Sequence, residues 1–190
     1  MTKKIIKSIL EIAIMVTIGI TIYHKVVGMI GRRKYNDDID EALNSKVSNY
    51  KGQIVIRLPW GKRIGMSSGP IMFLGKGVDI GERGKRLVRH EHGHFLEYQQ
   101  LGFLKYAVGV GIPSLINNLR KTRPYYKQPW EINADLLAGV HRSDEHTEEA
   151  IEQGKRYFEY LKSSSFFSIF KNVWNFINHD LSAVKADSND

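Results

Sequence analysis

The chain contains no cysteine, so structural disulfides and cysteine-ligated zinc sites are excluded. This absence does not identify the compartment, because many exported proteins also lack cysteine. There is also no internal repeat and no low-complexity segment, which argues against a repeat architecture. What remains is 190 residues, 42% hydrophobic and 11% aromatic, enough for one globular domain with appended segments.

The positive charge of the chain has no accompanying nucleic-acid-binding signature. Lysine and arginine number 28 against 20 acidic residues, a net charge of +8. Much of the excess flanks an apolar run near the N-terminus, where attraction to an anionic membrane surface explains it. We therefore expect contact with a membrane and none with DNA or RNA.

The most apolar stretch runs from Ile5 to Ile30, and its centre, Ile9–Tyr23, carries a single charge at Glu11. A spanning helix needs about 20 mostly apolar residues, so residues 1–34 are predicted to form a membrane anchor or signal-like helix. Secretion after signal cleavage and an interfacial helix remain open alternatives. Basic residues flank both sides, which leaves the membrane orientation undetermined.

The run Arg89–His94 contains the pattern H-E-x-x-H as His90, Glu91 and His94. On a helix, two histidines four residues apart share a face and can bind one Zn²⁺, with the glutamate directed at a metal-bound water. Two alternatives remain open at this point. The cluster can be a chance group on a surface helix, or a strand whose alternating histidines, with His92 as the third, share a face.

The residues around this motif favour the helix. The stretch Lys85–Gln100 is too long for an ordinary strand and lacks β-branched enrichment. Gly84 precedes it and Gly102 follows it as a natural C-terminal stop. On a helix His92 points away from its neighbours, so we predict that it is not a ligand.

A third ligand is predicted from residues 129–139, which indicate a second helix with Pro129 in its first turn. Glu131 and Asp135 lie four residues apart, hence on one face of that helix. One carboxylate can complete a zinc site, and the other can hold a ligand imidazole by a hydrogen bond. The alternative is two acids on a solvated helix face.

H-E-x-x-H followed by E-x-x-x-D on a later helix resembles the gluzincin group of zinc metallopeptidases. The resemblance implies that His90, His94 and Glu131 bind zinc, that Glu91 is the general base, and that Asp135 supports a histidine ligand. Residues 52–140 also resemble small uncharacterised bacterial proteins with a zincin-like core. The features shared with them are Gly69–Gly75, Leu101-Gly102 and Gly111–Ser114.

The expected fold class is α+β, a mainly helical zincin-like core with a small β-sheet, preceded by the N-terminal apolar helix. The core is placed at residues 52–180, after a linker with a short helix at 35–51 and before a tail at 181–190. Strands are predicted at Gln53–Leu58 and Ile71–Leu74. Further helices are predicted at 103–109, 113–119, 147–161 and 165–177. The aromatic stripe of the last helix, Phe166, Phe167, Phe170 and Trp174, is expected to pack in the core.

The expected function is a membrane-associated, zinc-dependent peptidase or amide hydrolase acting on a peptide or protein substrate. Tyr125, Tyr126 and His141 are weaker candidates for stabilising the oxyanion or donating a proton; packing or surface roles are the alternative. A non-catalytic, zinc-stabilised interaction protein is the second hypothesis for the whole chain.

Overall fold

The structure is a computed structural model that describes residues 37–61, 64–120, 125–144 and 146–178. The chain divides into two units, Met1–Tyr35 and Asn36–Asp190. The N-terminal helix predicted at residues 1–34 and the tail at 181–190 lie outside the described residues. Among the helices that are described, none has the length and apolar character needed to cross a membrane.

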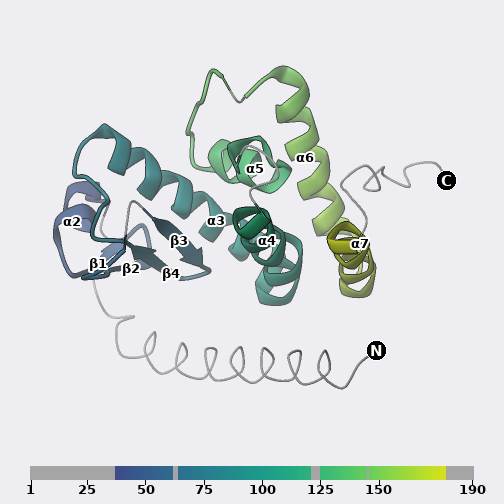
Figure 1. The fold of residues 1–190 in the computed structure, drawn as a ribbon, viewed down its shortest axis with the longest axis horizontal. Helices are drawn as coiled ribbons and strands as arrows, with labels where there is room; N and C mark the ends of the chain where they lie inside the picture. Colours follow the sequence, from purple (N-terminus) through teal and green to yellow (C-terminus); the bar gives the residue numbers. More distant parts are fainter. Residues whose placement is uncertain (1–36, 62–63, 121–124, 145, 179–190) are drawn as a thin grey trace. The chain divides into compact units, whose positions relative to one another are not determined.

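A small mixed sheet forms one side of the second unit (Figure 1). Its spatial order is β1-β2-β4-β3, with β2 and β4 parallel and the outer pairs antiparallel. The two predicted strands are present as β2 and β4. The strand bounds are β1 Val47–Tyr50, β2 Gln53–Arg57, β3 Gly65–Ser68 and β4 Ile71–Leu74.

The two outer strands were not predicted. The sequences of β1 and β3 are VSNY and GMSS, polar enough to indicate a linker and a turn. Both become strands because an apolar neighbour, β2 or β4, offers its free backbone groups. The segment 35–51 does contain the expected short helix, α2 at Ile39–Asn44, and its Ala42 and Leu43 are fully buried.

The long helix α3, Glu82–Tyr106, lies along the sheet and carries the H-E-x-x-H motif (Figure 1). Its Val88 packs with Val55, Met72 and Leu74 of the sheet in one apolar core. At the predicted stop, Gly102 has φ 71° and ψ 167°, which breaks the helical backbone there and divides α3 into two segments across a kink. The helix begins earlier than expected, with Gly81 as its N-cap.

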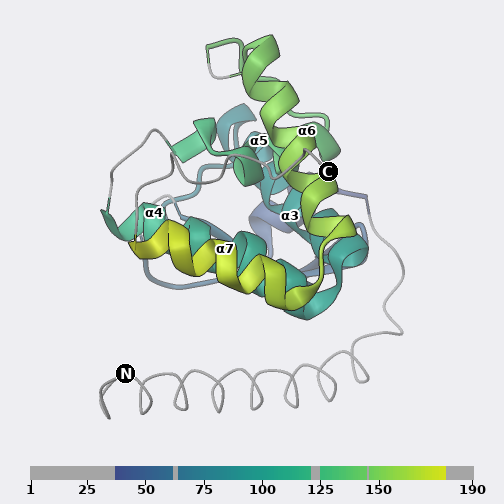
Figure 2. The ribbon, with the colours of Figure 1, turned by 90° about the vertical axis from the view of Figure 1, so that its right-hand side faces the viewer.

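Helical elements form most of the remaining described residues. A second apolar core joins Leu101, Val110, Trp130, Leu161 and Ile169. Helix α7 lies beside α4 and the π-helical turn η1 (Figure 2). The helices predicted after the motif are all present, which confirms the α+β fold class. Their bounds are η1 Ala107–Gly111, α4 Ile112–Arg120, the 3-10 turn η2 Tyr125–Lys127, α5 Pro129–Leu137, α6 Glu148–Ser163 and α7 Phe166–Asn178.

The expected burial of the aromatic stripe on α7 is wrong. Ile169 and Val173 face the core, with exposed fractions of 1% and 8%. Phe166 is half-buried against the same core, whereas Phe167, Phe170 and Trp174 are exposed. Ile169 and Val173 lie on the face of α7 next to the aromatic stripe, and this face packs against the core.

Gly93, at the centre of the motif, allows α3 and α5 to approach closely. A Cβ atom at this position would lie 2.0 Å from the carbonyl oxygen of Ala134 and 2.6 Å from its carbonyl carbon. These are backbone atoms of α5, so a rotamer change cannot relieve the overlap. Glycine is therefore the residue that fits where the two helices cross.

We expect Gly93→Ala to lower the free energy of unfolding by roughly 3 kcal/mol, because α5 must move away from α3. Denaturant unfolding monitored by circular dichroism measures this change. Gly111→Ala is the matched control, since its added Cβ would meet nothing closer than 3.9 Å. Alanine is intrinsically the better helix former, so the control should be neutral or slightly stabilised. Equal stability of the two variants would contradict the close approach.

Candidate metal centre

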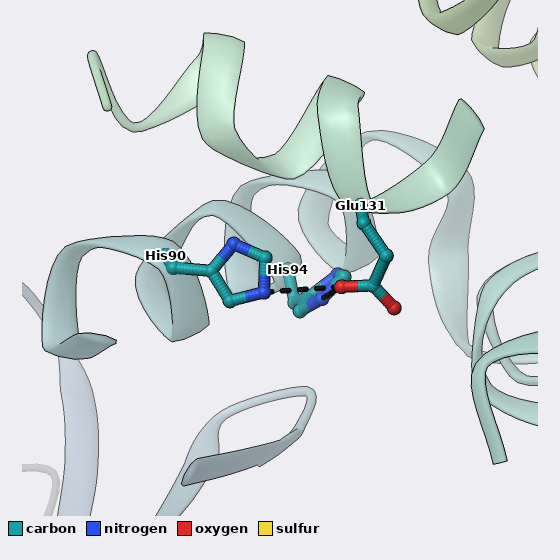
Figure 3. Close-up of side chains that lie close together, drawn as sticks. All are labelled: His90, His94 and Glu131. Atoms are coloured by element: carbon teal, nitrogen blue, oxygen red, sulfur yellow. Dashed lines mark hydrogen bonds and ion pairs between the residues drawn. The ribbon is translucent and has the colours of Figure 1, made fainter. Parts of the chain in front are cut away.

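Two helices bring three candidate ligands together (Figure 3). His90 and His94 lie one turn apart on α3, and Glu131 projects towards them from the first turn of α5. All three are buried, with exposed fractions of 1%, 5% and 0%. Residues separated by 37 positions in the sequence therefore form one compact group, the one that the resemblance to gluzincins implied.

The spacing of the donor atoms suits a small cation. Oε2 of Glu131 lies 3.1 Å from Nε2 of His90 and 3.2 Å from Nε2 of His94. One ligand atom from each residue lies within 4.8 Å of the other two. Ligand atoms held about 2.0–2.1 Å from a tetrahedral ion are separated from one another by roughly 3.3 Å. The buried group of His90, His94 and Glu131 could thus hold a metal ion.

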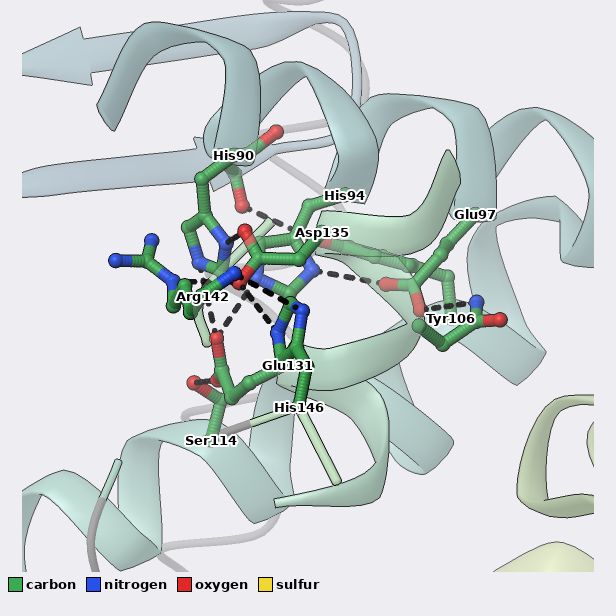
Figure 4. Close-up of polar contacts among 11 residues, drawn as sticks. His90, His94, Glu97, Tyr106, Ser114, Glu131, Asp135, Arg142 and His146 are labelled. Atoms are coloured by element: carbon green, nitrogen blue, oxygen red, sulfur yellow. Dashed lines mark hydrogen bonds and ion pairs between the residues drawn. The ribbon is translucent and has the colours of Figure 1, made fainter. Parts of the chain in front are cut away.

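The opposite nitrogen of each imidazole is held by a carboxylate (Figure 4). Nδ1 of His90 lies 2.7 Å from Oδ1 of Asp135, and Nδ1 of His94 lies 2.8 Å from Oε2 of Glu97. Because a carboxylate accepts a proton donated by Nδ1, the lone pair of Nε2 is left to face the shared centre. Both rings are oriented as metal-binding imidazoles usually are.

Glu131 is oriented as well. The Ser114 hydroxyl on α4 donates a hydrogen bond of 2.7 Å to Oε1 of Glu131, which leaves Oε2 facing the two histidines. A further layer surrounds Asp135. Its Oδ2 lies 2.6 Å from Nε of Arg142 and 3.2 Å from Nε2 of His146. Each of the three candidate ligands therefore has a partner that fixes its direction.

The surroundings favour positive charge at the two imidazoles. Burial alone would lower the pKa of His90, but its hydrogen bonds to Asp135 and Glu131 raise it to about 9. Burial would also lower the pKa of His94, but the charge of Glu131 and the hydrogen bonds to Glu131 and Glu97 together raise it. In turn, the two imidazoles lower the pKa of Glu131 although burial opposes them. A divalent cation would satisfy the same preference for positive charge.

Glu91 is buried beside this group, with an exposed fraction of 3%. It faces the edge strand β3, where the backbone of Ser67 forms a hydrogen bond with it. A Cβ atom at Gly65 would lie 2.6 Å from Oε1 of Glu91, so the strand passes directly over the carboxylate. Burial raises the pKa of Glu91, while the nearby charges of His90 and His94 act in the opposite direction.

No protein-family model, curated protein or solved structure matches this chain.

The remaining candidates from the sequence lie in different places. The ring of Tyr126 is 5.3 Å from that of His90, next to the candidate ligands. Tyr125 begins the turn η2. His141 is exposed, and no contact among the described residues joins it to His90, His94 or Glu131. His92 packs 5.4 Å from the ring of Tyr50, outside the three-residue group.

Sequence reasoning missed several residues that shape the site. Glu97 lies three residues after His94 on the same helix, and this spacing was a usable signal for a partner of that imidazole. Ser114 and Arg142 come from other elements and gave no such signal. Tyr106 is also buried nearby, with its ring 6.5 Å from that of His94 and its hydroxyl donating to the backbone oxygen of Ser67.

Proposed function

We propose that the chain is a zinc-dependent peptidase or related amide hydrolase. The observation that carries this proposal is the convergence of Nε2 of His90, Nε2 of His94 and Oε2 of Glu131, with each imidazole held by a carboxylate behind it. Two nitrogens and one carboxylate oxygen are a donor set typical of catalytic zinc, which keeps a further position for water. The resemblance of the two motifs to gluzincins supports the same assignment.

The residues of the site have different roles in the proposed hydrolysis. When bound, zinc supplies Lewis acidity, which polarises a carbonyl group and lowers the pKa of a bound water to about 7. Glu91 would take the proton of the attacking water and return it to the leaving amine. Asp135 and Glu97 keep the two imidazoles in position, and Ser114 does the same for Glu131.

The burial of the site favours a second candidate function, a metal-stabilised interaction protein without catalysis. His90, His94 and Glu131 are each at most 5% exposed, as ligands of a structural metal usually are. The exposed aromatic residues of α7, Phe167 and Phe170, offer a surface for a partner. Association with a membrane through residues 1–34 remains part of the proposal for either function.

Metal analysis and digestion of a synthetic peptide mixture by the purified full chain test these alternatives. Stoichiometric zinc together with cleavage that stops on chelation and returns when zinc is added is the result expected of a peptidase. Stoichiometric zinc, a higher Tm with zinc, and no cleaved peptide would favour the structural role instead. Failure to bind zinc or any other divalent ion would contradict both functions.

A further inference from the structure

A cavity of about 360 Å³ lies beside the metal centre, between the start of α3 and the turn η2. Three arginines line it: Arg83, Arg86 and Arg142. Tyr126 also lines the cavity, and its ring lies 5.3 Å from that of His90. The cavity therefore adjoins one of the proposed zinc ligands.

The charge of this cavity is strongly positive. Among the described residues that line it, Asp79 is the only acid. Its Oδ1 accepts hydrogen bonds from the backbone N–H groups of Gly81 and Gly84. These bonds hold that oxygen at the start of α3. Within the described part of the chain, no carboxylate forms an ion pair with Arg83 or Arg86. Two arginines without acidic partners, beside a third that uses only its Nε for Asp135, favour an anionic ligand.

Arg142 is held in a fixed orientation at this cavity. Its guanidinium carbon lies 3.5 Å from the ring centre of Tyr126, and its Nε binds Asp135. Figure 4 shows the two terminal nitrogens directed away from the buried carboxylates, and neither has an acceptor among the described residues. A planar guanidinium with both terminal nitrogens available matches the two oxygens of a carboxylate.

We propose that this arginine-lined cavity is a substrate subsite that binds a carboxylate of a peptide. The inference rests on the proposed peptidase function and specifies its substrate class: peptides that place a negative charge next to the bond to be cleaved. The carboxylate comes either from an acidic side chain or from the C-terminus of the peptide. Arg83 and Arg86 are exposed and add attraction, whereas Arg142 provides the oriented contact.

Matched synthetic peptides test the subsite. In one set, a peptide carrying glutamate at a given position is compared with the same peptide carrying glutamine there, position by position. In the other set, peptides with a free C-terminus are compared with the same peptides amidated at the C-terminus. The variant is Arg83→Gln combined with Arg86→Gln, because both side chains are exposed and neither contacts the candidate ligands. We expect it to raise KM about fivefold to tenfold for the acidic peptides and to leave the neutral ones unchanged. Arg89→Gln is the control, since this arginine lies on α3 but lines a different cavity with His92.

A binding measurement separates this inference from the proposed function. Labelled peptides are titrated into zinc-loaded Glu91→Gln protein, with or without the two arginine substitutions, and followed by fluorescence anisotropy. Carboxylate-dependent binding that the double variant weakens supports the subsite even if no peptide is cleaved, an outcome that counts against the peptidase alone. Cleavage or binding with no preference for a carboxylate overturns the subsite and leaves the peptidase standing. The subsite is also overturned if Arg89→Gln weakens the binding of acidic peptides as much as the double variant does.

Discussion

A Glu91→Gln protein is expected to retain its metal and to lose peptide cleavage by roughly a thousandfold, the contribution typical of a general base. Glutamine has nearly the shape of glutamate but cannot accept a proton from water. Glu91 is not a member of the three-residue group that could hold the ion, so metal binding should survive. The measurements are kcat on a cleaved peptide and the zinc content of the same preparation.

Glu149→Gln serves as the matched control, because Glu149 lies exposed in the first turn of α6. This variant should keep both metal and activity. If Glu91→Gln retains full activity, Glu91 is not the base. If it purifies without zinc, the carboxylate contributes to metal binding, and the assignment of the ligands must change.

The helices and the candidate ligands could be predicted from the sequence because their signals are local. The spacing of His90 and His94 and that of Glu131 and Asp135 each place two side chains on one face of a helix. Pro129 and Gly102 mark where a helix begins and where another stops. The spacing alone left Glu131 and Asp135 both possible as the third ligand, and the resemblance to gluzincins implied Glu131.

Features that depend on tertiary contacts could not be predicted in the same way. The polar strands β1 and β3 exist because β2 and β4 pair with them. Gly93 counts against a helix by propensity, yet its missing side chain allows α5 to reach α3. The aromatic residues of α7 form a helical stripe, but only the position of the core decides that Ile169 and Val173 are buried instead.

The arrangement of the acids explains how a buried site can hold a cation. Three carboxylates, Glu97, Glu131 and Asp135, have no exposed surface and contact the two imidazoles. Of these three carboxylates, Asp135 alone is paired with Arg142 and His146 in the described structure, through its Oδ2 atom. Negative charge therefore predominates around the Nε2 atoms, which favours a bound cation there and explains the raised pKa of His90 and of His94.

Replacement of Glu131 tests most directly whether the negative charge around the two Nε2 atoms holds a cation. Glu131→Ala should raise the Kd for zinc by more than the 10- to 100-fold typical of losing a carboxylate behind a ligand, because it deletes a ligand itself. Asp135→Asn removes the charge of a carboxylate behind a ligand and should show this smaller loss. Asp144→Asn is the control at an exposed position and should bind zinc normally. Competition with a chromophoric chelator measures each Kd.

Glu131→Gln distinguishes loss of the ligand from loss of the fold. The amide keeps the volume of the side chain and an acceptor for Ser114, so the packing of α5 on α3 should persist while the charge is gone. Weak zinc binding by a folded Glu131→Gln protein would locate the defect at the metal. Zinc bound with native affinity by both Glu131 variants would instead show that Glu131 of α5 is not a ligand. The two histidines of α3 would then need a third ligand from elsewhere, and the proposed relation between the two motifs would fail.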